Sequence, residues 1–413
     1  MQKKAILIIG QVWPEPQTTA AGQRMLQLIA LFFEYGYTLH FACAAKVSEF
    51  SSTLTDFGVI CHSIQINDSQ FDELLITIQP EIVMYDRFIV EEQFGWRVSE
   101  NLPNALTILD TEDLHSLRKT RELAIAKNTT FSKTLYIQQE ITKREIASMY
   151  RCDLTLLISD YEMQLLSEYF NLDRVLLLHL PMFADYITHE VKSQWNTFEN
   201  RQNFMTIGSG RHAPNVDSIC YTIENIWPFI RKELPEASFE IYGAYLPQKV
   251  KQLHQPKKGI YIKGWIAKEQ LAFQKARICL APLRFGAGIK GKLLTAMQYG
   301  TPTITTPIGA EGMLPEDGDW NGFISEDPNQ LAKAAVRLYT NKNLWLQCQQ
   351  NGIELINTKF QKERYQSIVK DKIEYAKKDV HQFRAINFIG AMLRHHTLQS
   401  TKYLAKWIEE KNK

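Results

Sequence analysis

Short apolar runs alternate with stretches of helical spacing along the first half of the chain. Residues 23–35 show the helical pattern, with apolar side chains recurring every three or four positions. Residues 134–150 predict a longer, charged helix whose polar face lies in solvent. Strands are predicted at residues 5–9, 38–42, 59–66, 82–85, 105–109 and 154–158, with 175–178 as a weaker candidate. This alternation predicts a parallel sheet with helices on both faces.

A polar, aperiodic stretch at residues 187–203 predicts a linker, after which a second alternating series begins. A helix with apolar residues from Val216 to Ile230 follows its first strand. Strands of this series are predicted at residues 204–207, 239–242, 260–262, 278–282 and 303–306. We therefore expect an α/β chain with an N-terminal Rossmann-like domain over residues 1–190 and a C-terminal one over residues 200–375, facing each other across a cleft.

The end of the chain predicts a basic helical tail. Residues 376–413 carry eight Lys or Arg against three acidic residues. Within this tail, an apolar stripe at helical spacing is formed by Tyr403, Leu404, Trp407 and Ile408. The favoured interpretation is a helix docked on the N-terminal domain. The alternative is an interfacial helix in contact with anionic lipid.

Composition narrows the classes of function. A net charge of +2 over 413 residues argues against a general nucleic-acid-binding protein. The sequence contains no run of 18 apolar residues, so no membrane-spanning helix is expected. The six cysteines are widely spread without metal-ligand spacing, which indicates a reducing compartment and hence the cytoplasm. The apolar start after the first lysines is short and lacks a small-residue cleavage site, so it predicts a strand instead of a signal peptide.

The loop before the helix predicted at residues 291–298 carries the clearest chemistry. Strand, glycine-rich loop, helix and strand form a β-α-β unit here, so the loop lies at the carboxyl end of a parallel strand. Gly286 and Gly288 allow backbone N–H groups to approach a ligand closely. Lys290 and Lys292 add two positive charges at a helix start, where the helix dipole already favours an anion. The loop predicts a phosphate or diphosphate ligand, and the alternative is a tight turn with solvated lysines.

This segment closely resembles the donor-binding segment of the group 1, family-4 glycosyltransferases, which are retaining enzymes of the GT-B fold. The resemblance lies in Ala-Met-Gln-Tyr-Gly-Thr-Pro at residues 296–302 and Gly-Ala-Glu-Gly at residues 309–312. It implies the GT-B fold, with the last helices crossing back onto the first domain, and a nucleotide-sugar donor. The residues it implies for donor binding in this segment are Gly286, Gly288, Lys290, Lys292, Thr295 and Glu311.

The chain departs from the family at two positions. Many members carry two glutamates eight positions apart, and Ala287 and Thr295 stand there in this chain. In the family, the second glutamate holds the donor ribose. Thr295 can make one hydrogen bond at that place but cannot accept two hydroxyls as a carboxylate does. One branch of the family also lacks the first glutamate.

The resemblance implies donor contacts in two further turns of the chain. Gly22 follows the first strand, where the family's turn faces the donor phosphates and the acceptor; alternatively it only starts a helix. In the turn at residues 209–215, Arg211 is the best candidate for the diphosphate, and Asn215 is a polar group at the helix start. Arg211 and Lys290 together would clamp a diphosphate. The alternative for Arg211 is a surface ion pair.

The segment at residues 110–115 follows a strand of the N-terminal domain and resembles the family's acceptor side. Asp113 and His115 are the candidates for orienting the sugar or the acceptor, with catalytic roles beside Lys290. Asp110 is a candidate helix cap, and a capping role for the whole segment is equally open. Asp86 and Arg87, after another strand, are expected to line the cleft.

These features favour a hexosyltransferase-type enzyme that moves a sugar, with retention, from a nucleotide-sugar donor to a saccharide or lipid-linked acceptor. The resemblance suggests cell-envelope polysaccharide or glycolipid synthesis and a cytoplasmic enzyme, peripheral at the inner face of the membrane. Asp317 and Asp319 form the only Asp-x-Asp and predict a solvated turn, so no metal cofactor is expected. The alternatives are a sugar-nucleotide epimerase and a non-catalytic nucleotide-sugar-binding protein. A nicotinamide-dependent dehydrogenase is disfavoured because neither half carries Gly-x-Gly-x-x-Gly after its first strand.

Overall fold

A computed structural model describes residues 4–315 and 317–411 of the chain. The first half forms a seven-stranded parallel sheet in the order β3-β2-β1-β4-β5-β6-β7. Its strands are β1 (Ala5–Gly10), β2 (Thr38–Cys43), β3 (Ile60–Ser63), β4 (Ile82–Asp86), β5 (Leu106–Asp110), β6 (Leu154–Leu157) and β7 (Leu177–His179). Its helices are α1 (Ala20–Glu34), α2 (Gln70–Ile78), α3 (Phe88–Asn101), α4 (His115–Ala126), α5 (Lys133–Gln138), α6 (Glu140–Arg151) and α7 (Asp160–Phe170).

The second half forms a six-stranded parallel sheet in the order β10-β9-β8-β11-β12-β13, reached through the linker helix α8 (His189–Ser193). Its strands are β8 (Phe204–Ile207), β9 (Phe239–Tyr242), β10 (Ile260–Gly264), β11 (Ile278–Ala281), β12 (Thr303–Thr305) and β13 (Gly322–Ile324). Its helices are α9 (Ala213–Tyr221), α10 (Trp227–Glu233), α11 (Gln248–Lys251), α12 (Glu269–Lys275), α13 (Gly291–Gln298), α14 (Pro307–Ala310), α15 (Pro328–Thr340) and α16 (Lys342–Lys359).

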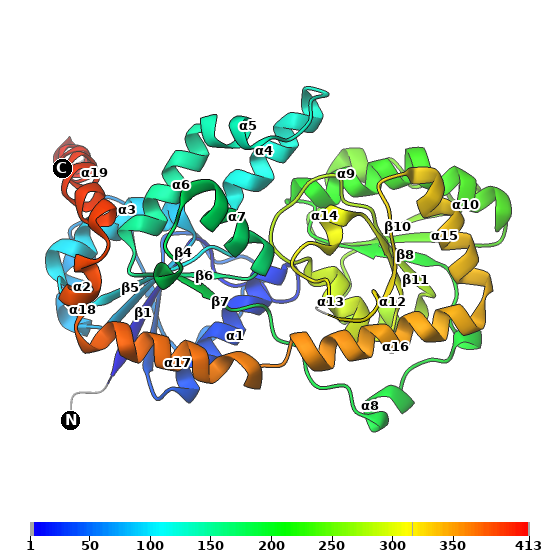
Figure 1. Cartoon of the computed structure of the whole chain (residues 1–413), viewed down its shortest axis with the longest axis horizontal. Coiled ribbons are helices and arrows are strands. Elements are labelled where there is room, and N and C mark those ends of the chain that lie inside the picture. The colour runs from blue at the N-terminus through cyan, green and yellow to red at the C-terminus, as the bar shows by residue number, and fades with distance from the viewer. Residues whose placement is uncertain (1–3, 316, 412–413) are drawn as a thin grey trace.

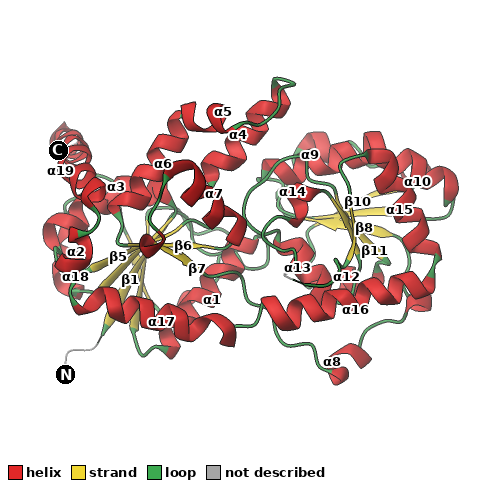
Figure 2. Ribbon diagram, viewed as in Figure 1, coloured by secondary structure: helices red, strands yellow, loops and turns green. Residues whose placement is uncertain are grey.

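Each sheet lies between layers of helices, and the two domains stand side by side (Figures 1 and 2). In β1, Ile6 and Ile8 pack into the core on one face, and Leu7 and Ile9 into the core on the other. Burial on both faces explains why the strands are continuous apolar runs. Both sheets reverse their strand order beside their first strand, which is where open α/β sheets bind ligands. The predicted pair of parallel-sheet, Rossmann-like domains is confirmed.

Two elements differ from the sequence prediction. Strand β3 covers only Ile60–Ser63 of the predicted 59–66. The predicted helix over 134–150 is broken at Gln139, whose backbone is extended, into α5 and α6. The break lets Tyr136 from α5 and Glu145 from α6 both bond to the hydroxyl of Ser116.

The polar residues of α6 are divided between solvent and the interior. Glu140, Lys143 and Arg144 are exposed, as the sequence suggested, whereas Thr142, Glu145 and Ser148 are buried. Glu145 is buried, and its carboxylate accepts the backbone N–H groups of His115 and Ser116 at 2.9 Å each. Those N–H groups start α4 and have no partner within their own helix, so a carboxylate stabilises them. Burial raises the pKa of Glu145 to about 7.

The chain crosses back to the N-terminal domain earlier than residue 375. Helix α16 packs against α13, whereas α17 (Glu363–Lys378) lies on the first domain. Tyr365, Val369 and Ile373 of α17 belong to the same core cluster as Ile6 and Ile8. The boundary expected at 375 therefore falls inside α17, because its apolar face completes the N-terminal core.

Two further helices, α18 (Val380–Ala385) and α19 (Phe388–Lys411), follow, and α19 packs on α3 and α6 (Figure 1). The buried carboxylate of Asp153 anchors them by accepting hydrogen bonds from Arg384 and Arg394. The docked side of α19 presents Ala405, which is buried beside Trp96.

The apolar stripe of the tail is not the docked side. Tyr403, Leu404 and Trp407 are 63%, 58% and 60% exposed. On a helix Tyr403 and Trp407 lie opposite Ala405 and Leu404 lies to its side, so docking through Ala405 turns them to solvent. Ile408, the fourth residue of the stripe, lies nearer to Ala405 and is half-buried. Within the described residues, no helix is long and apolar enough to cross a membrane.

Candidate active site

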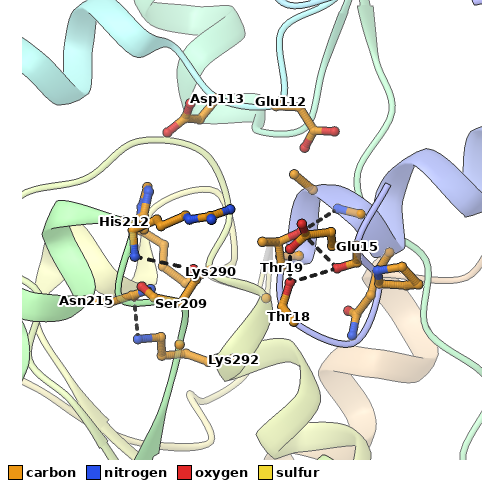
Figure 3. Close-up of a pocket in the computed structure, with 18 of the residues that line it drawn as sticks. Glu15, Thr18, Thr19, Glu112, Asp113, Ser209, His212, Asn215, Lys290 and Lys292 are labelled. Atoms are coloured by element: carbon orange, nitrogen blue, oxygen red, sulfur yellow. Dashed lines mark hydrogen bonds between the residues drawn. The ribbon is translucent and has the colours of Figure 1, made fainter. Parts of the chain in front are cut away.

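A cleft of about 470 Å³ lies between the two domains, at the carboxyl ends of the strands. The N-terminal domain contributes the turn between β1 and α1 and the loops after β4 and β5. The C-terminal domain contributes the turns after β8 and β9 and the glycine loop between β11 and α13. Figure 3 shows Glu15, Thr18, Glu112 and Asp113 on one side, facing Lys290 across the cleft. Large, mostly apolar clefts with a few polar groups are the usual ligand sites of such folds.

Lys290 and Lys292 sit at the N-terminus of α13, as predicted from the glycine loop. Lys290 is the N-cap residue, and its Nζ donates to the carbonyl of Gly288 at 2.7 Å. Gly288 has a left-handed backbone, with φ of 61°, which turns the loop toward the helix. The Nζ of Lys292 donates to Oδ1 of Asn215 at 2.8 Å.

Neither lysine has a negative partner among the described residues: both bond only to neutral oxygens. Burial lowers the pKa of Lys290 to about 8 and that of Lys292 to about 8. Glu311 and Glu162 act to raise the pKa of Lys290 without bonding to it, but burial outweighs them. Burying a cation without an ion pair is costly, and the N-terminus of α13 adds its own positive potential. The structure therefore holds two positive groups at the cleft, the buried Lys290 and the half-buried Lys292, that an anionic ligand would stabilise.

The turn between β8 and α9 supports this site. Asn215 is buried, and its Nδ2 donates to the carbonyl of Ser209 at 3.0 Å, which orients Oδ1 toward Lys292. Arg211 lines the cleft, but its guanidinium lies over the ring of Tyr245, 3.6 Å from the centroid. The Tyr245 hydroxyl donates in turn to Glu15 of the other domain at 3.1 Å. Arg211 is thus an exposed side chain of the cleft lining that stacks on Tyr245 and forms no ion pair with another described residue. Its clamp on a diphosphate with Lys290 stays a prediction.

Three of the remaining donor candidates also lie in the cleft. Gly286 and Thr295 line it, and Thr295 is buried on the first turns of α13. Gly22 lines it as the third residue of α1. A Cβ atom on Gly22 would lie 2.4 Å from the backbone of Glu15, so packing of the preceding turn requires glycine there.

Glu311 and Gly288 do not line the cleft. The carboxylate of Glu311 accepts two hydrogen bonds of 2.7 Å from Arg121 of α4, across the domain interface. Arg121 also donates to the carbonyl of Gly286 at 2.8 Å, and the N–H of Gly288 donates to Glu162 at 2.7 Å. Both loop residues are engaged in holding the two domains together, because a buried carboxylate is best satisfied by a bidentate guanidinium.

The acceptor-side candidates form one cluster that lines the cleft. Asp113 lies 3.3 Å from Nε2 of His115 and accepts a 2.7 Å hydrogen bond from Arg118. Burial lowers the pKa of His115 to about 4, so its ring is neutral at pH 7. Burial acts to raise the pKa of Asp113, but Arg118 and His115 outweigh it and hold that pKa below the usual range. Asp110 is no helix cap: it accepts hydrogen bonds from the buried Arg24.

Glu112 was missed by the sequence analysis. Its backbone is left-handed, with φ of 60°, which is uncommon for a non-glycine residue and typical of functional sites. The side chain is 9% exposed, its Oε1 has no hydrogen-bond partner, and it points into the cleft (Figure 3). Burial, together with nearby Asp110, raises the pKa of Glu112 well above its ordinary value. No local sequence signal separates Glu112 from its acidic neighbours, because the strained turn is set by tertiary structure.

Asp86 and Arg87 line the cleft as expected. Asp317 and Asp319 lie in an exposed turn around Gly318 and do not line it. Among residues 4–315 and 317–411, no group of three or more His, Cys, Asp or Glu side chains is arranged to hold a metal ion.

Two doubly wound domains, a cleft at both switch points and C-terminal helices that cross back define the GT-B architecture. Residues 201–341, which make up most of the C-terminal domain, match the family model "Glycosyl transferases group 1". Among the curated proteins, none matches the chain in sequence.

Solved structures similar to this chain share its fold over most of their length. HepE from Anabaena, in complex with UDP, is 13% identical with a TM-score of 0.66, covering 90% of this chain and 100% of HepE. TarM from S. aureus is 10% identical with a TM-score of 0.69, covering 89% of this chain and 98% of TarM. Sucrose-phosphate synthase from Thermosynechococcus elongatus is 15% identical with a TM-score of 0.64, covering 90% and 99%. At such identities the likeness establishes the GT-B fold.

Proposed function

We propose that this protein is a glycosyltransferase that binds a nucleotide-sugar donor in the interdomain cleft and transfers the sugar to an acceptor. The observation that carries the proposal is the pair of cations at the N-terminus of α13, the buried Lys290 and the half-buried Lys292, which bond only to neutral oxygens. A diphosphate supplies the negative charge that this site lacks. The family match over residues 201–341 and the UDP complexes of HepE support the same assignment.

In the transfer step, the bond between the sugar's anomeric carbon and the diphosphate oxygen breaks, and a bond from that carbon to an acceptor oxygen forms. As the first bond breaks, its electron pair leaves with the diphosphate, so negative charge builds up on the phosphate oxygens. The acceptor hydroxyl loses its proton, which passes to the departing diphosphate. Lys290, Lys292 and the α13 N-terminus stabilise that charge, which is the role we assign to them in place of a divalent metal. Retention of the anomeric configuration, as in family 4, is part of the proposal and rests on the resemblance of residues 284–313.

The acceptor belongs to the N-terminal side of the cleft. Arg118 holds Asp113, which lies beside His115, and Glu112 offers an unpartnered carboxyl oxygen to a hydroxyl group. A saccharide or a lipid-linked saccharide, with a hexose as the transferred sugar, is the substrate class we propose. Because the HepE complexes contain UDP, UDP-sugars are the first donors to test.

The exposed face of α19 supports a peripheral membrane contact as part of this proposal. Tyr403, Leu404 and Trp407 stand out from the helix, with the exposed Lys406 and Lys411 among them. Aromatic and aliphatic side chains beside lysines fit the interface of an anionic bilayer. Such a contact would bring a cytoplasmic enzyme to a lipid-linked acceptor.

The second candidate is a protein that binds a nucleotide sugar without turnover, and the observation that favours it is Thr295. A carboxylate for the donor ribose is missing at this position. Weak or absent turnover with intact donor binding is what such a protein would show.

Binding and turnover separate the two candidates. Isothermal titration of the full chain with UDP, GDP, ADP, dTDP and CMP, in the presence of EDTA, tests for the site. The proposal predicts that at least one nucleoside diphosphate binds, and that Lys290→Ala weakens its binding by about 1.5–3 kcal/mol, the range for a hydrogen bond to a charged group. Arg284→Ala, which removes an exposed arginine outside the cleft lining, is the matched control. A folded wild-type chain that binds none of these nucleotides contradicts the proposal.

A further inference from the structure

Helices α12 and α13 lie side by side on one face of the C-terminal sheet. The rings of Phe273 in α12 and Tyr299, the residue that caps the C-terminus of α13, stack with centroids 6.2 Å apart and an interplanar angle of 30°. One turn nearer the cleft, Glu269 precedes Phe273 and Thr295 precedes Tyr299, each by four residues. Both Glu269 and Thr295 line the cleft. The two helices therefore bring a carboxylate on α12 next to the threonine that replaces a carboxylate on α13.

Glu269 has hydrogen-bonding capacity to spare. It is half-buried, and its Oε1 accepts one hydrogen bond, from Nε2 of Gln23 in α1, at 3.2 Å. A carboxylate offers two oxygens and about four acceptor positions. Burial raises the pKa of Glu269, and the bond from Gln23 partly offsets this. A carboxylate held at a cleft with a single long bond is suited to accept hydroxyl donors from a ligand.

The surroundings indicate which part of the ligand would meet it. On one side are Lys290 and Lys292, where a diphosphate is stabilised. On the other side, the loop between β10 and α12 places Trp265 and Ile266 on the cleft, an apolar surface suited to a flat base. Glu269 follows that loop directly. In a nucleoside diphosphate, the ribose with its two hydroxyl donors lies between base and diphosphate.

We propose that Glu269 accepts hydrogen bonds from the ribose hydroxyls of the donor nucleotide, in place of the carboxylate that is absent at Thr295. This inference rests on the proposed function, because it requires a nucleoside diphosphate in the cleft. It makes Glu269 a determinant of specificity for ribonucleotides over deoxyribonucleotides. In this proposal the hydrogen-bond acceptor for the ribose comes from α12 instead of α13.

The test compares three probes on the full chain: the ribonucleoside diphosphate that binds best, its 2′,3′-dideoxy analogue, and inorganic diphosphate. Wild-type protein is expected to bind the ribonucleotide at least tenfold more tightly than the dideoxy analogue, as a hydrogen bond to a charged group implies. The Glu269→Gln variant should bind the ribonucleotide at least tenfold more weakly than wild type does. Its affinities for the dideoxy analogue and for inorganic diphosphate should equal those of wild type. Glu236→Gln, at an exposed glutamate of the same domain, should leave all three affinities unchanged.

The outcomes separate this inference from the proposed function. If ribonucleotide and dideoxy analogue bind wild-type protein equally, the ribose assignment is wrong while the donor site stands; this comparison needs no variant. If Glu269→Gln weakens the binding of all three probes equally, Glu269 has a structural role and the inference is overturned. Absence of binding by any nucleoside diphosphate overturns both proposals.

Discussion

Arg121 of the N-terminal domain donates two hydrogen bonds of 2.7 Å to the carboxylate of Glu311 in the C-terminal domain. The two side chains are 6% and 16% exposed, so the pair is largely buried where the domains meet. Arg121 also holds the carbonyl of Gly286 in the glycine loop. The relative position of the domains and the shape of the donor loop are thus linked through one guanidinium.

Breaking this pair should destabilise the protein. Glu311→Gln leaves the Arg121 guanidinium buried without its counter-charge, which typically costs about 3 kcal/mol in such pairs. Thermal or urea unfolding measures the loss, with Glu326→Gln as the control at an exposed glutamate. In the double variant with Arg121→Met, the loss should be smaller than the sum of the two single losses. Strictly additive losses would show that the two side chains do not interact in solution.

Nucleotide binding should depend on pH through the two lysines at the N-terminus of α13. The pKa of Lys290 and that of Lys292 are lowered to about 8 by burial, and a bound diphosphate raises both. Affinity should therefore fall as the pH rises through 8, where the free site loses its charge. Binding near pH 8 should take up protons, which titration calorimetry in buffers of different ionisation enthalpy detects. Proton release near pH 8, or affinity that rises with pH, would contradict this electrostatic role.

A glutamate on α13 should replace the one on α12. In the Glu269→Gln background, Thr295→Glu puts a carboxylate back beside the ribose, one helix over. We expect the double variant to regain most of the ribonucleotide affinity that Glu269→Gln loses. In the wild-type background, Thr295→Glu puts two carboxylates close together and should gain little. Failure of the double variant to recover, with the fold intact, would show that residues 269 and 295 do not share a ligand group.

The outer face of α19 should bind anionic vesicles. Replacing Tyr403, Leu404 and Trp407 together with serine removes the exposed apolar groups but leaves the docked side at Ala405 intact. Co-sedimentation of the full chain with phosphatidylglycerol vesicles at low salt should fall in this variant, with little change in thermal stability. Ile76→Ser, at an exposed residue of α2, is the control. Equal sedimentation of variant and wild type would remove the membrane contact from the proposal.

Much of the fold follows from local pattern. Strands buried on both faces, such as β1, are continuous apolar runs, and the helices between them carry apolar stripes, so two parallel sheets were predictable. The break at Gln139 and the burial of Glu145 were not predictable from local sequence. Both depend on Ser116, which lies far from them in sequence and close in space.

The candidate site divides in the same way. Lys290 and Lys292 were visible because a glycine loop before a helix is a local signal for an anion. Glu311 looked like a ligand residue from its loop, yet its partner Arg121 lies 190 positions away. Glu112 and Glu269 escaped notice because a left-handed turn and a cross-helix neighbour are tertiary properties.

Release of nucleoside diphosphate from nucleotide sugars tests the central claim most directly. Wild-type protein and Lys290→Ala would be incubated with UDP-, GDP-, ADP- and dTDP-linked hexoses, with and without saccharide acceptors, and the free nucleotide and sugar measured. The account predicts that wild type cleaves at least one donor in EDTA, and that the folded variant is slower by tenfold or more. A wild-type chain that binds a nucleoside diphosphate but cleaves no donor under any condition would contradict the proposed glycosyltransferase activity. It would favour the second candidate, a protein that binds a nucleotide sugar without turnover.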